Sequence, residues 1–292
     1  MHAGRWDDAL AELSARERAA ADRGDVRSRV ALLVATSRVL LDEGLNRRAD
    51  VSRALEPAER ARTLAEQLAD PALLADALDR IGNVHYWQWA LDDPSSGDAL
   101  LHEAAALFER AWSSRRSAPG LAYSHFHLGL IAEAEERTSL AEKHFARALE
   151  LAGNDAKMAS YAHRHLAARD EAAGRSDEAE RRLRRSLEIR RALGWRAGVA
   201  SGLDALAGFM MRASRTAEAR PLLREAIAIA RDIGSAYYVS RAARTLALVE
   251  ERTGDIAAAI AVLHDTRADV AALRAATLRA EHATLLARLE QR

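Results

Sequence analysis

The sequence predicts an all-α protein built from repeated helix pairs, and three observations carry this prediction. Hydrophobic residues make up 49% of the 292 residues and aromatic residues only 5%, so the apolar content is mostly Ala and Leu, which favour close-packed helices. With 15 Gly and 5 Pro there is too little turn chemistry for a many-stranded β fold. A pattern of small and large residues also recurs at nearly constant spacing, which is typical of repeat architectures.

Each copy of the pattern begins with Leu or Ile followed by Gly or Ala. A polar stretch, an Ala, a bulky residue four positions later and a small residue three positions after that complete it. The five copies begin at Ile81-Gly82, Leu128-Gly129, Leu166-Ala167, Leu206-Ala207 and Leu246-Ala247. The small residue lets two antiparallel helices approach, and the bulky residue of the second helix, such as Phe145, fills the space between them.

This pattern resembles the tetratricopeptide repeat (TPR) family, in which Leu-Gly in a first helix is followed by Ala, an aromatic residue and Ala in a second. The resemblance covers most of the chain and implies a right-handed α-solenoid of antiparallel helix pairs. The later copies begin at 128, 166, 206 and 246, a spacing of about 40 residues, whereas the standard repeat has about 34. Such enlarged repeats resemble the TPR arrays of MalT-like bacterial regulators and those of Rap-type peptide receptors.

The expected organisation is a single TPR-like solenoid over residues 1–292. Residues 1–70 form irregular N-terminal pairs, 71–264 the main repeats with a polar insertion at 92–98, and 265–292 a capping helix that is either continuous or broken once. The first helical segment, from Arg5 to Leu13, reads as the second helix of a pair whose first helix is missing. The chain is therefore either a fragment of a longer protein or begins with an unpaired cap.

Composition excludes several classes of protein. Positive and negative residues balance at 43 each, which gives no global reason to expect direct nucleic-acid binding, although a local basic stripe stays open. The absence of Cys excludes disulfides, thiolate zinc sites and cysteine nucleophiles. No apolar run approaches the ~20 residues of a membrane span, and the start lacks the apolar stretch of a signal peptide. We expect a cytoplasmic protein without a membrane partner, and its preference for Arg over Lys is typical of GC-rich bacterial genomes.

The resemblance also implies where a partner would bind, because first helices line the concave face of TPR arrays. Residues three, four and seven positions apart share that face. The candidate binding residues are Asp76, Asp79, Asn83, Tyr86, Trp87, Tyr123, Phe126, Glu133, Tyr161, Arg164, Asp204, Arg241 and Arg244. One end of this groove is acidic, the middle aromatic and the far end basic, which suits an extended peptide or a partner helix. The alternative is a solvated helix face without a ligand.

The segment His85-Tyr86-Trp87-Gln88-Trp89 is the densest unusual stretch. Five consecutive residues cannot all face one helix core, so one or two of the rings should meet a groove, the insertion or a partner. Two Trp side chains near carboxylates could form a platform for a sugar or a cation. The alternative, which we favour for Trp89, is packing beneath the insertion.

The histidines do not predict a metal site. His125 with His127, and His163 with His165, are two residues apart, so each pair diverges by about 200° on a helix and cannot chelate one ion. A site could form only between helices, for instance from His127 and His165, and no clear third ligand supports it. We expect one His of a pair at a helix interface and the other partly exposed, with neither metal nor cofactor.

Signatures of catalysis are missing as well. The sequence contains no Gly-rich phosphate loop and no zincin motif, and Gly198-Val199-Ala200-Ser201-Gly202 only approximates a nucleophile elbow on a predicted helix. The leading hypothesis is a TPR-type module, regulatory or scaffolding, that binds a protein or peptide segment in the concave groove. The alternatives are a small-molecule sensor or enzyme with a pocket near Tyr86 and Trp87, and a self-associating scaffold that forms a homodimer.

Overall fold

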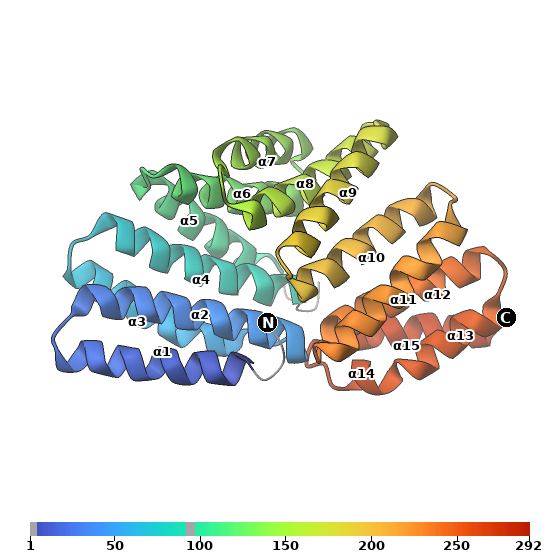
Figure 1. The fold of residues 1–292 in the computed structure, drawn as a ribbon, viewed down its shortest axis with the longest axis horizontal. Coiled ribbons are helices and arrows are strands. Elements are labelled where there is room, and N and C mark those ends of the chain that lie inside the picture. Colours follow the sequence, from blue (N-terminus) through green and yellow to red (C-terminus); the bar gives the residue numbers. More distant parts are fainter. Residues whose placement is uncertain (1–4, 92–96) are drawn as a thin grey trace. The chain divides into compact units, whose positions relative to one another are not determined.

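The computed structural model describes residues 5–91 and 97–292, and these residues form helices and short connections without any strand. Successive helices run antiparallel in sequential pairs (Figure 1). The helices are α1 (Arg5–Asp22), α2 (Val26–Arg48), α3 (Leu55–Gln67), α4 (Pro71–Leu91), α5 (Ala99–Ser114), α6 (Ala118–Ala134), α7 (Thr138–Leu151), α8 (Ala156–Ala172), α9 (Ser176–Ala192), α10 (Arg196–Arg212), α11 (Thr216–Asp232), α12 (Ala236–Arg252), α13 (Ile256–Asp265), α14 (Arg267–Ala271) and α15 (Ala276–Glu290), with a 3-10 turn at Ser52–Ala54. The predicted all-α fold of antiparallel helix pairs is confirmed.

The chain divides into two compact units, each with its own core. The N-terminal unit comprises residues 2–45 and 50–162, and the C-terminal unit comprises 46–49 and 163–292. Most of the predicted insertion at 92–98 lies outside the described residues.

The small-against-large fit holds the N-terminal unit together at two places. A side chain added at Gly82 would lie 2.7 Å from the Phe108 ring, and one added at Gly129 would lie 2.6 Å from the Phe145 ring. Both Phe rings are fully buried, at 1% and 0% exposure. Only glycine leaves room for each ring to approach the first helix of its pair this closely, which explains the Leu-Gly and Ile-Gly signatures.

In the C-terminal unit the same fit uses a smaller pair of residues. Ala167 and Leu183 share a buried cluster, as do Ala207 and Leu223. Ala247 and Leu263 belong to the cluster at the C-terminal end. These pairs have alanine in the position of glycine and leucine in the position of phenylalanine. The combined volume of the two side chains therefore changes little from one helix pair to the next. The repeat register predicted from the sequence is therefore confirmed in both units.

Short turns with a left-handed residue end many of the helices. Glycine occupies this position after α8, α9, α11 and α12, at Gly174, Gly194, Gly234 and Gly254, with φ between 60° and 84°. A glycine in this conformation is a common way for a helix to end. The corresponding residues after α6 and α10 are Glu136 (φ 59°) and Ser214 (φ 61°), so these two turns hold an ordinary side chain in a conformation that favours glycine.

Replacing Ser214 with glycine should therefore stabilise the protein by about 1 kcal/mol, because the left-handed conformation costs a residue with a side chain roughly that much. Ser214 is exposed, so the substitution changes the backbone preference and little else. Urea denaturation measures the change. The matched control is Gly194→Ser, at φ 60° and with open space around it, which should lose a similar amount. A Ser214→Gly variant of unchanged or lower stability would contradict the strain argument.

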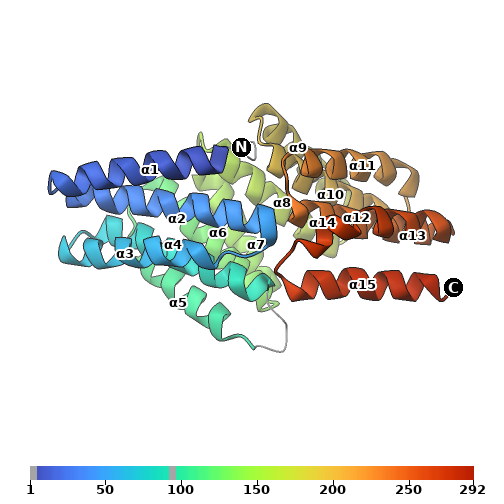
Figure 2. The same ribbon diagram turned by 90° about the horizontal axis from the view of Figure 1, so that it is seen from below.

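The helices at the two ends of the chain each contact a neighbouring helix. The segment read as an isolated second helix is α1, whose Trp6 indole donates a hydrogen bond to Asp42 of α2 at 3.0 Å. After α13, the chain forms the five-residue helix α14 and then α15, so residues 265–292 are not one continuous helix. Helix α15 lies beside α13 (Figure 2) and buries Leu285 and Leu289 against Leu263. Among the described residues, no helix is both long and apolar enough to cross a bilayer.

Candidate functional site

A buried polar network connects α4 with α6 in the N-terminal unit. His127 Nδ1 lies 2.8 Å from Asp79 Oδ1, and the Asn83 amide nitrogen lies 3.0 Å from the Asp79 backbone oxygen and 3.1 Å from His127 Nε2. Because that amide nitrogen bonds a carbonyl oxygen, it must be a donor, so His127 Nε2 accepts from it. His127 is therefore the neutral tautomer that carries its proton on Nδ1 and donates it to Asp79.

Two arginines neutralise the Asp79 carboxylate. Arg80 Nη2 lies 2.7 Å from Asp79 Oδ2, and Arg115, which follows the end of α5, lies 3.5 Å from Oδ1. Arg115 also donates to the Gly120 carbonyl oxygen at 3.0 Å and to exposed Asp76 at 2.9 Å. This single guanidinium therefore connects the first half of α4 with the end of α5 and the start of α6.

The electrostatics of the network follow from burial and from these contacts. Burial alone would raise the pKa of Asp79, but the His127 hydrogen bond and the Arg115 and Arg80 guanidiniums outweigh it and hold the pKa below its ordinary range. Burial lowers the pKa of His127 despite the neighbouring carboxylate. The charged Asp79 and the neutral His127 hold helices together and do not form a ligand site. Both side chains are below 6% exposure, and their polar atoms already have partners within the protein.

An aromatic surface lies next to this network. We define the aromatic face as Tyr123 and Phe126 of α6 with Tyr161 of α8, three residues predicted to contact a ligand. The Phe126 and Tyr161 rings are 5.3 Å apart between centroids, and Phe126 is 7% exposed. The Tyr123 hydroxyl donates to Asp155 at 3.0 Å, and burial, followed by the Asp155 charge, raises the pKa of this tyrosine. The buried Phe126 thus supports the partly exposed Tyr161, whereas the partly exposed Tyr123 lies beside the buried His127 ring, 6.2 Å away between centroids.

Tyr86 and Trp87 of α4 form a second aromatic group together with Trp89. Tyr86 meets Trp87 edge-on at 5.7 Å and Trp89 at 5.8 Å, and all three rings are half-buried. The Trp89 indole donates to Asp98 at 3.0 Å, which agrees with packing beside the insertion. The alternative hypothesis predicts a pocket near Tyr86 and Trp87 that the insertion covers. Residues 92–96 of this insertion lie outside the described residues. That alternative stays a prediction.

Two further candidate binding residues lie in the middle helices, Glu133 in α6 and Arg164 in α8. Glu133 is half-buried near the end of α6. Arg164 follows Tyr161 by one helical turn, and its Nη1 lies 3.3 Å from the His165 Nε2. Both side chains are accessible in part, and both have interactions with neighbouring residues.

The candidates of the C-terminal unit form their own network across α10 and α12. Asp204, at 7% exposure, accepts from the Thr245 hydroxyl at 2.7 Å and from Arg241 at 3.3 Å. The Arg241 guanidinium also lies over the Tyr237 ring. Arg244 is exposed and pairs with Glu281 of α15 at 3.4 Å. Asp204 and Arg241 are thus paired with each other, and Arg244 presents the more accessible charge.

The expected division of each histidine pair into one buried and one partly exposed residue holds in one helix only. In α6 His127 is buried and His125 is partly exposed, whereas in α8 His163 and His165 are both partly exposed. One further contact could not be read from spacing within one helix. His125 Nδ1 lies 3.0 Å from His144 Nδ1 of α7, so one ring must donate and the other accept, and burial lowers the pKa of both. The Gly129–Phe145 packing is the signal for this contact, because His144 precedes Phe145 and His125 lies one turn before Gly129. No group of three or more potential metal ligands occurs among the residues that the structure describes.

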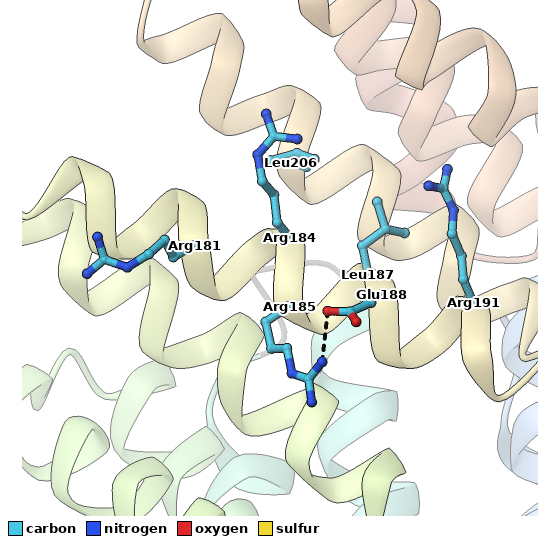
Figure 3. Close-up of a pocket in the computed structure, with 7 residues that line it drawn as sticks. All are labelled: Arg181, Arg184, Arg185, Leu187, Glu188, Arg191 and Leu206. Atoms are coloured by element: carbon cyan, nitrogen blue, oxygen red, sulfur yellow. Dashed lines mark hydrogen bonds and ion pairs between the residues drawn. The ribbon is translucent and has the colours of Figure 1, made fainter.

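A hollow of about 570 Å³ lies along α9 in the C-terminal unit (Figure 3). Its lining consists of Arg181, Arg184, Arg185, Leu187, Glu188 and Arg191 of α9 with Leu206 of α10. The two leucines are 5% and 2% exposed and form the floor, whereas the four arginines are exposed. The balanced composition is compatible with a local basic stripe but does not give its position, and four arginines of α9 line this hollow.

Comparison with known proteins gives a likeness of fold. No protein-family model matches the sequence, and a search of curated proteins finds no match either. Among solved structures, a Rap protein complexed with Competence and Sporulation Factor has a TM-score of 0.61 at 14% identity, covering 99% of this chain and 86% of its own. BtubC (BKLC) from P. vanneervenii has a TM-score of 0.57 at 18% identity, covering 76% and 88%.

A tetratricopeptide repeat protein from Parabacteroides merdae covers 98% of this chain and all of its own length, with a TM-score of 0.55 at 13% identity. At such low identities these structures show the fold alone, and that fold is a TPR-like helical repeat. The likeness includes TPR and Rap proteins and does not single out a MalT-like subfamily.

Proposed function

We propose that the protein is a binding module that holds a protein or peptide segment against the aromatic face of Tyr123, Phe126 and Tyr161. The observation that carries this proposal is that two partly exposed tyrosines from separate helices each lie beside a buried ring, Tyr161 beside Phe126 and Tyr123 beside His127. Tyrosine offers a large, amphipathic contact area at a small entropic cost, which suits recognition of a polypeptide.

The buried network gives this surface the rigidity that binding requires. Asp79, His127 and Arg115 fix α6 against α4 and α5, and the Tyr123 hydroxyl bond to Asp155 fixes α6 against the start of α8. A surface that is ordered before it binds loses less conformational freedom on association. In this view Asp79 and Asn83 act by positioning α6, and the tyrosines contact the partner.

The likeness to a Rap protein complexed with Competence and Sporulation Factor supports a binding role, since this fold accommodates a bound partner in that protein. The spacing of about 40 residues supports a relation to the enlarged arrays of MalT-like regulators. On these grounds we propose a regulatory role in the bacterial cytoplasm for the module.

Replacing Tyr161 with alanine should weaken partner binding at least about tenfold, because it removes one of the two accessible aromatic side chains of the surface. A random peptide array probed with labelled protein measures this loss on the peptides that the wild type binds. The matched control is Tyr238→Ala, a half-buried tyrosine of α12 in the other unit, which should leave the pattern unchanged. Circular dichroism should show that both variants remain folded. Equal binding by Tyr161→Ala and the wild type would remove the aromatic face as the binding site.

A further inference from the structure

The arginines around the α9 hollow have a regular spacing. Arg184 and Arg191 are seven residues apart, so they lie on one stripe of α9, two turns or about 10 Å from each other. Figure 3 shows both side chains rising on the side of α10, whereas Arg185 points to the other side of α9 with Glu188. Leu187 lies between the two arginines on the same side.

Both arginines can accept a further carboxylate. Their side chains are 53% and 51% exposed, and they pair with Glu180 of α9 and Glu225 of α11. Pairs this exposed contribute little to stability and exchange readily. A guanidinium also carries five N–H donors, and the bond to Glu225 uses one from Nη2 of Arg191, so a second acid can bind without displacing the first.

The hollow itself has the size and lining of a protein contact. Its volume of about 570 Å³ accommodates a bulky side chain, and the Leu187 and Leu206 floor together with the arginine stems gives that side chain an apolar environment. A rim of arginines around an apolar centre is the composition that protein interfaces favour.

We propose that this hollow binds an acidic amphipathic helix of a partner protein. The partner helix carries carboxylates seven residues apart that bind Arg184 and Arg191, and a Leu or Ile between them that enters the hollow over Leu187 and Leu206. This surface belongs to the C-terminal unit and is separate from the aromatic face, so the protein has two binding surfaces of different chemistry.

The charge pattern favours a protein over a nucleic acid. Glu188 is one of the lining residues and pairs with Arg185, and Glu180, Glu178 and Glu225 pair with arginines at the edge of the hollow. A phosphate backbone would meet these carboxylates along its whole length, whereas a helix with discrete acids can place its own charges at Arg184 and Arg191 alone.

The test uses a synthetic helical peptide with two Glu residues seven positions apart and Leu residues between them, titrated into the full-length protein and followed by fluorescence anisotropy. Arg184→Ala and Arg191→Ala should each weaken binding about tenfold. Arg147→Ala is the matched control, because Arg147 is 54% exposed on α7 and pairs with Glu150, as the hollow's arginines pair with their neighbours. This variant should bind like the wild type.

A second peptide separates recognition from simple charge attraction. It has the same composition, but its two Glu residues are five positions apart and point about 140° away from each other. It should bind at least about tenfold more weakly than the first peptide. The proposal would be overturned if the two peptides bound equally well, or if all three arginine variants lost binding equally. It would also be overturned if a short DNA duplex bound more tightly than the first peptide and lost this binding in Arg184→Ala.

Discussion

Replacing Phe145 with alanine is expected to lower the free energy of unfolding by about 3–5 kcal/mol, as is typical when a buried aromatic ring is removed from a packed core. Phe145 of α7 is fully buried and lies against Gly129 of α6, with no room for a Cβ between them. The glycine side offers no atoms that could move into the space, so the vacated volume should remain a cavity. Urea denaturation followed by circular dichroism measures the effect.

The control is Leu140→Ala on the same helix, since Leu140 is 36% exposed and should cost less than about 1 kcal/mol. A sharper test follows from the other repeats, which use an Ala–Leu pair at this position. Gly129→Ala and Phe145→Leu should each destabilise the protein, and the double variant should lose less than the sum, with a coupling of about 0.5–3 kcal/mol. Strict additivity, or a Phe145→Ala variant as stable as the wild type, would show that these residues do not pack as a pair.

This pairing explains why the fold could be predicted from the sequence. Helix-to-helix packing in a repeat is local, and Gly129 and Phe145 are only 16 residues apart, so every copy contains both halves of its own contact. The pattern of small and large residues is weak evidence in any one copy, but five copies in register make the helix-pair repeat clear. The same reasoning explains the near match to a nucleophile elbow, because a side chain added at Gly198 would lie 2.2 Å from the Trp195 ring, and this glycine serves packing within α10.

The candidate site was less predictable because its contacts connect different repeats. The sequence predicts that Asp79 and Asn83 lie on the inward face of α4, but it does not show that His127 and Arg115, which are 48 and 36 residues from Asp79, contact this carboxylate. An inward position in a helix pair can face a neighbouring helix or a ligand, and spacing alone gives the same pattern for both. The hollow on α9 was missed for a related reason, since six arginines between 181 and 191 look like a solvated helix face until Leu206 of the next helix provides a floor.

Replacing Asp79 with alanine should also destabilise the protein by about 3–5 kcal/mol, because it leaves buried partners without their counter-charge. Arg115 and Arg80, at 8% and 14% side-chain exposure, would each lose a carboxylate, and His127 would lose its hydrogen-bond acceptor. Asp76→Ala is the matched control, since it removes another carboxylate from Arg115 but one that is 54% exposed, and it should cost less than about 1 kcal/mol. Similar losses for the two variants would mean that the network contributes no more than a surface ion pair.

The pH dependence of stability tests the protonation states of the same network. The pKa of His127 is lower in the folded protein than its unfolded value of about 6.5, so below that pH the unfolded chain binds a proton that the folded chain does not, and stability falls as the pH falls. The pKa of Asp79 is also lowered by folding, so its contribution is complete above about pH 4 and is lost at lower pH. His127→Asn should therefore flatten the decline between about pH 6.5 and 5, whereas Asp79→Asn should flatten the part below about pH 4. If instead the wild type gained stability on acidification through pH 6.5 and His127→Asn abolished that gain, His127 would be the protonated partner of Asp79, and the donation from Asn83 to its Nε2 could not exist.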